Sequence, residues 1–307
     1  MSVQREKVRF VSSDAECAAW HYPGTNGACI VMAGGFGVTK EPGTDKFAKH
    51  FSDAGYTVLA FDYRRLGESG GLPRLVQPVG DMLADWDAAI EFARALPDVD
   101  PQRLAIWGFS ASGGHIFRVA ARHPSLAAAI AQTPNADGLA ASRNQARYQK
   151  PLAMLRFTGI GILDAVGALT GRPPRLVALA GQPGDLALLT TPDSGDSDRA
   201  FGPDPYPDWQ RKVAARSALR LGFYSPGRYA SHVQSPLLVV VCDQDQCALA
   251  APAVRAARRA PRAELVELSG SHYAPFIDRH EQAVDAELSF LRRHLLEQSA
   301  ADAEVRS

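Results

Sequence analysis

The feature that most constrains this chain is an alternation of short, nearly continuous apolar runs with longer helical patterns. The apolar runs predict strands over 28–33, 56–61, 103–107, 126–132, 237–241 and 263–268. The stretches between them predict helices over 45–54, 79–96, 113–122, 252–260 and about 278–298. Strands that are apolar on both faces belong to a parallel sheet with helices on each side. The sequence therefore predicts an α/β fold with a mostly parallel central sheet and helices on both faces.

This alternation stops after Asn135 and resumes at Ser235, so residues 136–234 do not continue the sheet. We predict that they form a mostly helical cap over the carboxyl ends of the strands, and that 8–135 and 235–296 form one discontinuous core domain. Within the cap we expect an apolar element, a loop rich in Pro, Asp and Gly, and a basic amphipathic helix, over 151–170, 191–208 and about 209–221. Trp209 is expected to pack there or to line a substrate pocket.

The charge balance predicts no general attraction to polyanions. The chain has 33 basic and 33 acidic residues, so we expect neither a nucleic acid nor a membrane as partner. The N-terminal residues lack the apolar core of a secretory signal, and Arg156 and Asp164 interrupt the apolar stretch 151–170. We expect a cytoplasmic protein, and the oligomeric state stays open.

Metal and cofactor sites are not predicted. The four cysteines, Cys17, Cys29, Cys242 and Cys247, lack the paired spacing of a zinc site, and we expect reduced thiols. The glycine-rich residues 34–37 could suggest a phosphate loop, but they have neither a Lys-Thr ending nor a dinucleotide spacing.

Two serines lie where a predicted strand ends and a predicted helix begins, in Trp107-Gly108-Phe109-Ser110-Ala111-Ser112-Gly113-Gly114. Such a turn can be structural, because Ser caps helices and Gly allows close backbone approach. It can also be a nucleophile elbow, in which a strained turn exposes a serine hydroxyl. The second interpretation requires a histidine and a carboxylate within reach of that hydroxyl.

Polar residues follow two later strands, where the carboxyl ends of a parallel sheet gather functional groups. Residues 242–247 read Cys-Asp-Gln-Asp-Gln-Cys, and 269–273 read Ser-Gly-Ser-His-Tyr. The resulting order of Ser, Asp and His is that of nucleophile-elbow hydrolases. The glycine-rich turn after the first apolar run could present backbone N–H groups to a developing oxyanion.

Together these stretches resemble the alpha/beta-hydrolase family. The resemblance is to serine hydrolases that carry Phe-Asp-Tyr-Arg, Gly-x-Ser-x-Ser-Gly-Gly-His and a cap after the sixth core strand. The matching residues are 61–64, 67–71 and 108–115, and the resemblance runs from about Val8 to Leu296. It differs at two positions, since Gly34 replaces a histidine before the oxyanion donor and Ser271 replaces a glycine before the catalytic histidine.

The resemblance implies a role for five residues. Ser110 would be the nucleophile, His272 the general base and acid, and Asp245 the carboxylate that orients the imidazole. The backbone N–H groups of Phe36 and Ala111 would form the oxyanion hole.

Alternatives exist for each member of this set. Ser112 competes with Ser110, and Asp243 and Asp137 compete with Asp245. The histidines less suited by position are His123, His232, His280 and His294. We expect structural roles for His115, as a packed helix residue, and for Asp62 and Arg64, as ion-pairing residues.

The predicted function is that of a serine hydrolase acting on an ester, thioester or amide. An apolar cap indicates an apolar or mixed acyl substrate of small size. The resemblance also implies natural-product tailoring, in which transfer or cyclisation replaces hydrolysis. The competing hypothesis is a protein of this fold that binds a ligand, or isomerises it, without an acyl-enzyme.

Overall fold

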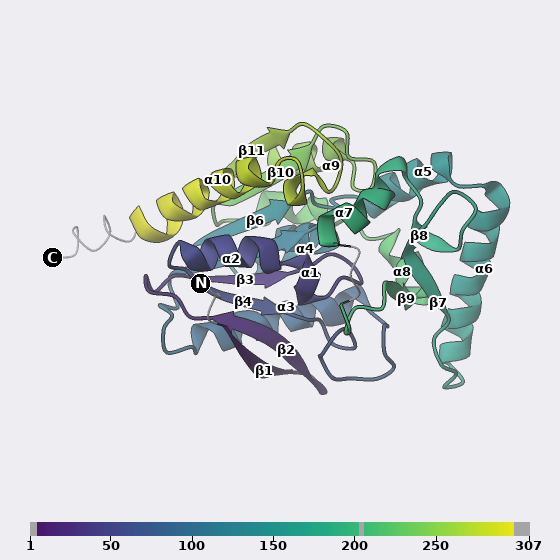
Figure 1. Ribbon diagram of the computed structural model, residues 1–307, viewed down its shortest axis with the longest axis horizontal. Helices are drawn as coiled ribbons and strands as arrows, with labels where there is room; N and C mark the ends of the chain where they lie inside the picture. Colours follow the sequence, from purple (N-terminus) through teal and green to yellow (C-terminus); the bar gives the residue numbers. More distant parts are fainter. Residues whose placement is uncertain (1–4, 203–205, 298–307) are drawn as a thin grey trace.

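The computed structural model describes residues 5–202 and 206–297. Its main body is an eight-stranded sheet (Figure 1), ordered β1-β2-β4-β3-β5-β6-β10-β11. The strands are β1 (Glu6–Ser12), β2 (Ala15–Tyr22), β3 (Cys29–Ala33), β4 (Thr57–Phe61), β5 (Leu104–Phe109), β6 (Ala128–Gln132), β10 (Leu237–Cys242) and β11 (Ala263–Leu268). From β4 to β11 the neighbouring strands are parallel, and β2 is antiparallel to both of its neighbours.

The register of the parallel strands aligns their carboxyl ends. Ala33 of β3 pairs with Gly108 of β5, and Phe109 of β5 pairs with Gln132 of β6. The loops that follow these strands therefore emerge together at one edge of the sheet, which is where functional side chains gather in such folds.

Helices cover both faces of the sheet, as the sequence predicts. On one face lie α2 (Asp45–Asp53) and α10 (His280–Leu291), and on the other α3 (Val79–Arg94), α4 (Ala111–Arg122) and α9 (Ala250–Ala257). The short helical turns of this body are α1 (Lys40–Gly43), η3 (Ala274–Phe276) and η4 (Arg292–Glu297).

The predicted strands and helices of this body are confirmed over the described residues, and Gln298, the expected end of the last helix, lies outside them. The sequence reasoning missed β1 and β2. These strands form the antiparallel edge of the sheet, and exposed and buried side chains mix along β1. Charged residues interrupt β1 at Glu6, Lys7 and Arg9, and Glu16 and His21 interrupt β2, so neither strand gives the mostly apolar run that identified the parallel strands.

Residues 136–234 are called the insertion below. Most of its described residues lie beyond the carboxyl ends of the strands, on the right of Figure 1, whereas residues 226–232 at its end pack against α4 and α9. The insertion follows β6, the sixth strand, and leads into β10. Its elements are α5 (Gly138–Tyr148), α6 (Pro151–Ala168), β7 (Leu176–Ala180), β8 (Ala187–Leu189), η1 (Pro192–Asp196), α7 (Ser197–Phe201), β9 (Lys212–Ala214), α8 (Ala215–Leu221) and η2 (Pro226–His232).

Three expectations for the insertion need correction. It contains a small sheet, in the order β8-β7-β9, which the helical prediction omitted. The basic helix expected near 209–221 begins only at Ala215, because Lys212–Ala214 pairs with β7 as a strand. The expected loop over 191–208 contains η1 and α7 in its described part, while residues 203–205 lie outside the described residues.

Helix α6 is held to the insertion by one buried carboxylate. Asp164 accepts hydrogen bonds from the backbone N–H groups of Arg175, at 2.8 Å, and Arg216, at 3.0 Å, and it pairs with the Arg216 guanidinium. Among the described residues, α6 is the one helix whose length and composition would allow it to cross a membrane. Its packing against α8 and this buried ion pair instead make it part of the insertion.

A buried glutamate of α10 contacts strand β5 of the sheet. Glu287 of α10 is fully buried and accepts a hydrogen bond of 3.0 Å from the indole N–H of Trp107 on β5. Burial raises the pKa of Glu287 well above its usual value. The folded protein therefore holds a proton on Glu287 that the unfolded chain releases above a pH of about 4.3.

We predict that Glu287→Gln stabilises the protein increasingly as pH rises, since the neutral amide keeps the shape of the protonated acid. The difference in free energy of unfolding, variant minus wild type, should grow by up to about 1.4 kcal/mol per pH unit above the unfolded pKa. Urea unfolding at several pH values measures it, with Glu281→Gln at the exposed start of the same helix as control. A difference independent of pH would contradict the assignment.

Candidate active site

The turn between β5 and α4 holds Ser110 in a strained conformation. Its φ of 58° and ψ of −116° lie in a region that residues with a side chain rarely adopt. The turn also needs Gly108, because a Cβ there would lie 2.5 Å from the carbonyl oxygen of Ser112. Two backbone hydrogen bonds stabilise this strained conformation. Ser110 N donates to Gln132 O at 3.0 Å, and Asn135 N donates to Ser110 O at 2.9 Å. The backbone has the form of a nucleophile elbow.

The structure brings His272 and Asp245 to this serine. His272 lies on the loop after β11, with its Nε2 atom 3.0 Å from Ser110 Oγ. Its Nδ1 atom lies 2.7 Å from Asp245 Oδ2, on the loop after β10. Three side chains far apart in the sequence thus form one hydrogen-bonded chain, in which the imidazole can accept the hydroxyl proton.

His272 is buried, and its partner Asp245 determines the direction in which its pKa shifts. Burial lowers the pKa of His272, but the neighbouring Asp245 carboxylate outweighs it and raises the pKa above the usual value. Asp245 Oδ1 accepts a bond of 2.6 Å from the backbone N–H of Ala248, which fixes the orientation of the carboxylate. A positively charged imidazole is therefore well supported here once it has taken a proton.

The two alternative acids lie elsewhere. Asp243 is exposed, and its Oδ1 accepts a bond of 2.8 Å from the backbone N–H of Gly270. Asp137 caps α5 by accepting from the backbone N–H of Leu139 at 3.1 Å. Each side chain is occupied by a structural hydrogen bond, and Asp245 is the carboxylate bonded to His272.

Ser112, the alternative serine, is fully buried behind the turn. Its hydroxyl donates to the carbonyl oxygen of Gly34 and lies 2.5 Å from the Tyr63 hydroxyl. It joins the α4 turn to the glycine-rich turn after β3 and lies outside the chain of Ser110, His272 and Asp245.

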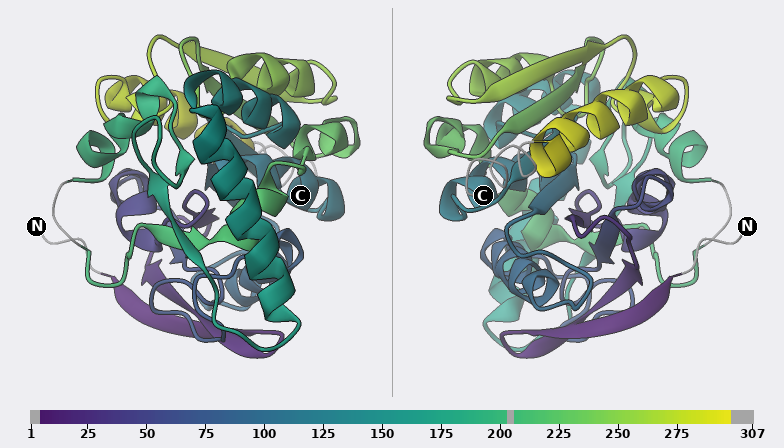
Figure 2. Two further views of the ribbon diagram at one scale, coloured as in Figure 1. Left: turned by 90° about the vertical axis from the view of Figure 1, so that its right-hand side faces the viewer. Right: turned by 90° about the vertical axis from the view of Figure 1, so that its left-hand side faces the viewer.

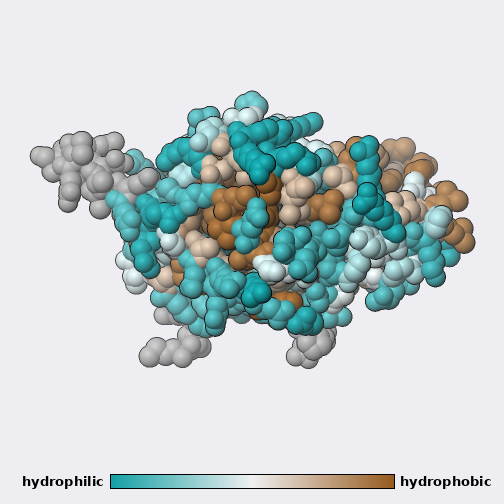
Figure 3. All heavy atoms as spheres, turned by 90° about the horizontal axis from the view of Figure 1, so that it is seen from above, coloured by the Kyte–Doolittle hydropathy of each residue, from teal (hydrophilic) through white to brown (hydrophobic). Residues whose placement is uncertain are grey.

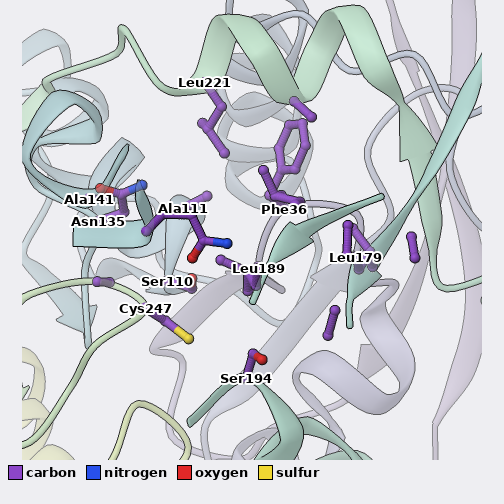
Figure 4. Close-up of a pocket in the computed structure, with 18 of the residues that line it drawn as sticks. Phe36, Ser110, Ala111, Asn135, Ala141, Leu179, Leu189, Ser194, Leu221 and Cys247 are labelled. Atoms are coloured by element: carbon purple, nitrogen blue, oxygen red, sulfur yellow. The ribbon is translucent and has the colours of Figure 1, made fainter. Parts of the chain in front are cut away.

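That glycine-rich turn packs directly against the serine. A Cβ added at Gly35 would lie 3.3 Å from Ser110 Cβ, a tight contact, so the approach of the two turns favours a glycine. Phe36 and Ala111 both line the space beside Ser110 (Figure 4). Ala111 is the first residue of α4, where backbone N–H groups have no carbonyl partner within the helix. The structure therefore places both residues predicted for the oxyanion hole next to the serine.

Two residues that the sequence reasoning did not assign to this turn hold it in place. Gln77 Oε1 accepts a bond of 2.9 Å from Gly37 N, and the indole N–H of Trp209 donates to Gly37 O at 2.8 Å. These two bonds fix the position of Gly37 in the turn. Gly34 occupies the position where the resemblance leads us to expect a histidine, and it has no side chain that could make such a bond. No sequence motif around Trp209 indicates its bond to Gly37, and the sequence predicts only that Trp209 packs in the cap or lines a pocket.

Asp193 of η1 is a second residue that the sequence reasoning missed. Its Oδ2 atom accepts from the backbone N–H groups of Gln246 at 2.8 Å, Cys247 at 3.3 Å and His272 at 3.4 Å. Burial raises the pKa of Asp193, but the nearby His272 and these donors outweigh it and lower the pKa below its usual value. One ionised carboxylate of the insertion therefore ties the loop of Asp245 to the loop of His272.

A cavity of about 560 Å³ opens beside Ser110, between the strand ends and the insertion. Its walls are mostly apolar, and Trp209 is part of them. Figure 4 shows Phe36, Leu179, Leu189 and Leu221 around the space next to the serine. The volume lies within the range of small-molecule sites.

The residues for which the sequence predicts structural roles do have such roles in the structure. His115 is fully buried, and burial lowers its pKa to about 3. Asp62 pairs with Lys40 at 2.8 Å and Arg64 with Asp85 at 2.6 Å, each within the core body. Across residues 5–202 and 206–297, no group of three His, Cys, Asp or Glu side chains is arranged to hold a metal ion. All four cysteines are free and buried.

Comparison with known proteins places the chain among enzymes of one family. The sequence matches the model of the Alpha/beta hydrolase family over residues 30–286. It is 37% identical over 292 residues to the quorum-quenching protein AidA of Acinetobacter baumannii, covering 93% of this chain and 94% of that protein. It is 30% identical to the polyketide transferase ATR5 of Stachybotrys chlorohalonatus over 182 residues, 59% of this chain and 58% of that protein. A thiohydrolase, apmlB of Arthrinium phaeospermum, is 29% identical over 53% of this chain and 51% of that protein.

Solved structures share the fold. The alpha/beta hydrolase GrgF from Penicillium sp. sh18 has a TM-score of 0.79 at 21% identity, over 95% of this chain and 99% of that one. The hypothetical protein PA2218 from Pseudomonas aeruginosa has a TM-score of 0.78 at 22% identity, over 95% and 94%. The alpha/beta-hydrolase fold predicted from the sequence is confirmed.

We predict that Asp193→Asn changes the pH dependence of Ser110 reactivity. The amide oxygen can still accept the three backbone bonds, but the lost negative charge lowers the pKa of His272. Reactivity, which is lost as pH falls through that pKa, should then persist to lower pH. The rate of covalent labelling by a fluorophosphonate as a function of pH measures this, with Asp185→Asn at an exposed site of the insertion as control. A slower reaction with an unmoved midpoint would mean that Asp193 acts only as a structural support.

Proposed function

Because the chain belongs to the alpha/beta hydrolase family, we propose that it cleaves an ester, thioester or amide through a covalent acyl-enzyme on Ser110. Its relatives carry names of hydrolases and acyl-transfer enzymes. The observation that carries the proposal is the chain of hydrogen bonds from Ser110 Oγ through the His272 imidazole to Asp245. A hydroxyl becomes an effective nucleophile when a base removes its proton during attack.

In the first half of the reaction, Ser110 Oγ attacks the carbonyl carbon while His272 Nε2 takes the hydroxyl proton. The carbonyl electron pair moves to its oxygen, and the N–H groups of Phe36 and Ala111 stabilise this oxyanion. When the carbonyl re-forms, the bond to the leaving group breaks and His272 gives that group its proton. The products are the free leaving group and an ester between the acyl group and Ser110.

In the second half, a water molecule takes the position of the leaving group. His272 removes a proton from the water as its oxygen attacks the acyl-enzyme, and then returns the proton to Ser110 Oγ. Asp245 keeps the imidazole in the tautomer with its proton on Nδ1 and stabilises the imidazolium that forms twice in each cycle. The elevated pKa of His272 is consistent with this second task.

The cavity supports an apolar or mixed acyl group as the substrate. Met154, Phe157 and Leu179 of the insertion and Phe109 of the core line it, together with polar side chains such as Gln145. Apolar walls take up the acyl chain, and a few polar groups fix its orientation. A lactone is an internal ester and falls within the same reaction class.

Acyl transfer or cyclisation is the second candidate, supported by the relatives named as polyketide transferases. The acyl-enzyme is the same, and the outcome depends on whether water or another nucleophile reaches it. The insertion covers the serine and could exclude water in favour of a hydroxyl of the substrate itself.

We predict that a fluorophosphonate probe labels the wild-type protein and that Ser110→Ala abolishes labelling, because the probe needs an activated hydroxyl. Ser112→Ala should retain labelling, since that hydroxyl is buried behind the turn. Mass spectrometry of the labelled peptides identifies the site. Failure of the folded wild-type protein to react would favour a ligand-binding protein without an acyl-enzyme.

We predict that Asp245→Asn lowers turnover of an activated ester by about 10³–10⁴-fold, as loss of the orienting carboxylate does in triad enzymes. Asp243→Asn is the matched control two residues away, and it should lose far less because it bonds only to Gly270 N. Circular dichroism checks that both variants fold. A large loss in Asp243→Asn with activity kept in Asp245→Asn would overturn the assignment of the acid.

A further inference from the structure

The outer side of α6 is apolar and faces solvent. Exposed side chains recur at spacings of three and four residues, with Leu155 69% and Leu169 86% exposed. Residues at this spacing share one face of a helix. The apolar side chains of this face are Leu152, Leu155, Ile162, Leu163, Val166 and Leu169. We call this set the α6 face.

The inner side of the same helix provides the contacts that pack α6 against the rest of the protein. Ala153, Gly161 and Asp164 are buried against the insertion, and Phe157 lines the cavity. Figure 2, left, shows α6 running across the outside of the molecule. The α6 face is therefore additional to the packing that holds the helix, and a soluble monomer gains nothing from exposing it.

The segment that carries the α6 face is rich in exposed basic side chains. In residues 138–175 all six Lys and Arg side chains are exposed, and Asp164 is the sole acidic residue. Asp164 is buried and paired with Arg216, so it does not neutralise them. The basic residues are Arg143, Arg147, Lys150, Arg156, Arg172 and Arg175. Figure 3 shows hydrophobic residues gathered at the right-hand end of the molecule, where α6 lies in Figure 1.

We propose that the α6 face docks the protein on an anionic lipid bilayer. A helix with an apolar face and flanking Lys and Arg binds flat at such a surface, where its apolar side chains enter the acyl boundary and its cations meet lipid phosphates. At 1.5 Å per residue, α6 would lie over about 27 Å of the surface. The long basic side chains can reach headgroups while their stems stay in apolar contact.

Charge decides against a second copy of the chain as the occupant. Pairing two α6 faces across a twofold axis would bring two sets of basic side chains together with no exposed acidic partner between residues 138 and 175. Such like-charge contacts oppose association. An anionic bilayer satisfies both the apolar side chains and the cations.

Docking through the α6 face would make a membrane a partner, contrary to the expectation drawn from composition. The zero net charge of the whole chain conceals a local excess of basic residues on the insertion. Docking through the α6 face is independent of the role of Ser110, because it involves the outer side of a helix whose inner side faces the cavity.

Sedimentation with vesicles tests the proposal on the full chain. Phosphatidylcholine vesicles that contain phosphatidylserine should bind the wild-type protein, and pure phosphatidylcholine vesicles should bind it much more weakly. Salt should weaken the binding, since the charges involved are exposed.

Two double variants separate the apolar from the ionic contribution. Leu155→Ser with Leu163→Ser should weaken binding at least about tenfold, since each leucine loses its apolar burial in lipid. Arg156→Glu with Arg172→Glu should weaken binding to anionic vesicles about tenfold or more. Val11→Ser and Arg262→Glu, at exposed sites of the core body, are the matched controls and should bind as the wild type does.

Thermal unfolding and fluorophosphonate labelling in solution should be unchanged in all these variants, because none of the residues lines the cavity. Absence of wild-type binding to anionic vesicles would overturn the proposal. So would a concentration-dependent dimer that Leu155→Ser with Leu163→Ser abolishes, because the α6 face would then be occupied by a second copy.

Discussion

The candidate site depends on a buried imidazole held between a hydroxyl and a carboxylate. His272 reaches Ser110 Oγ at 3.0 Å and Asp245 Oδ2 at 2.7 Å only because three loops leave the same edge of a parallel sheet. The fold can place these loops together because β5, β10 and β11 are parallel and their carboxyl ends are in register. The strained backbone at Ser110 is stable for the same reason, since β6 and the chain that follows it supply its hydrogen-bond partners. Sheet topology thus determines which chemistry the chain can carry.

The insertion takes part in the site and does not merely cover it. Trp209 bonds to the turn that carries Phe36, and Asp193 bonds to the loops that carry Asp245 and His272. A displacement of the insertion would loosen these loops, so access to the cavity and the alignment of the imidazole are physically linked. The proposed docking of α6 on a lipid surface acts on the same segment from its outer side.

Much of this arrangement could be predicted from the sequence. The nearly continuous apolar runs identified the parallel strands, and the turn around Ser110 with the polar residues after later strands identified the side chains that meet. What could not be predicted depends on contacts made at a distance. Edge strand β1 has one wet face, β9 is three residues long, and Asp193 lies in a Pro-rich stretch whose local pattern indicates only a loop. The choice among Asp243, Asp245 and Asp137 likewise required the position of the imidazole.

The central claim is that the acyl group passes through Ser110, and intact-protein mass spectrometry tests it most directly. The protein is mixed briefly with an activated ester of a medium-length acyl chain and quenched in acid before deacylation is complete. We expect a mass increase equal to one acyl group, found on the peptide that contains Ser110 and absent from Ser110→Ala. Rapid turnover of the ester with no acylated protein at any mixing time, and with activity retained in Ser110→Ala, would contradict the account.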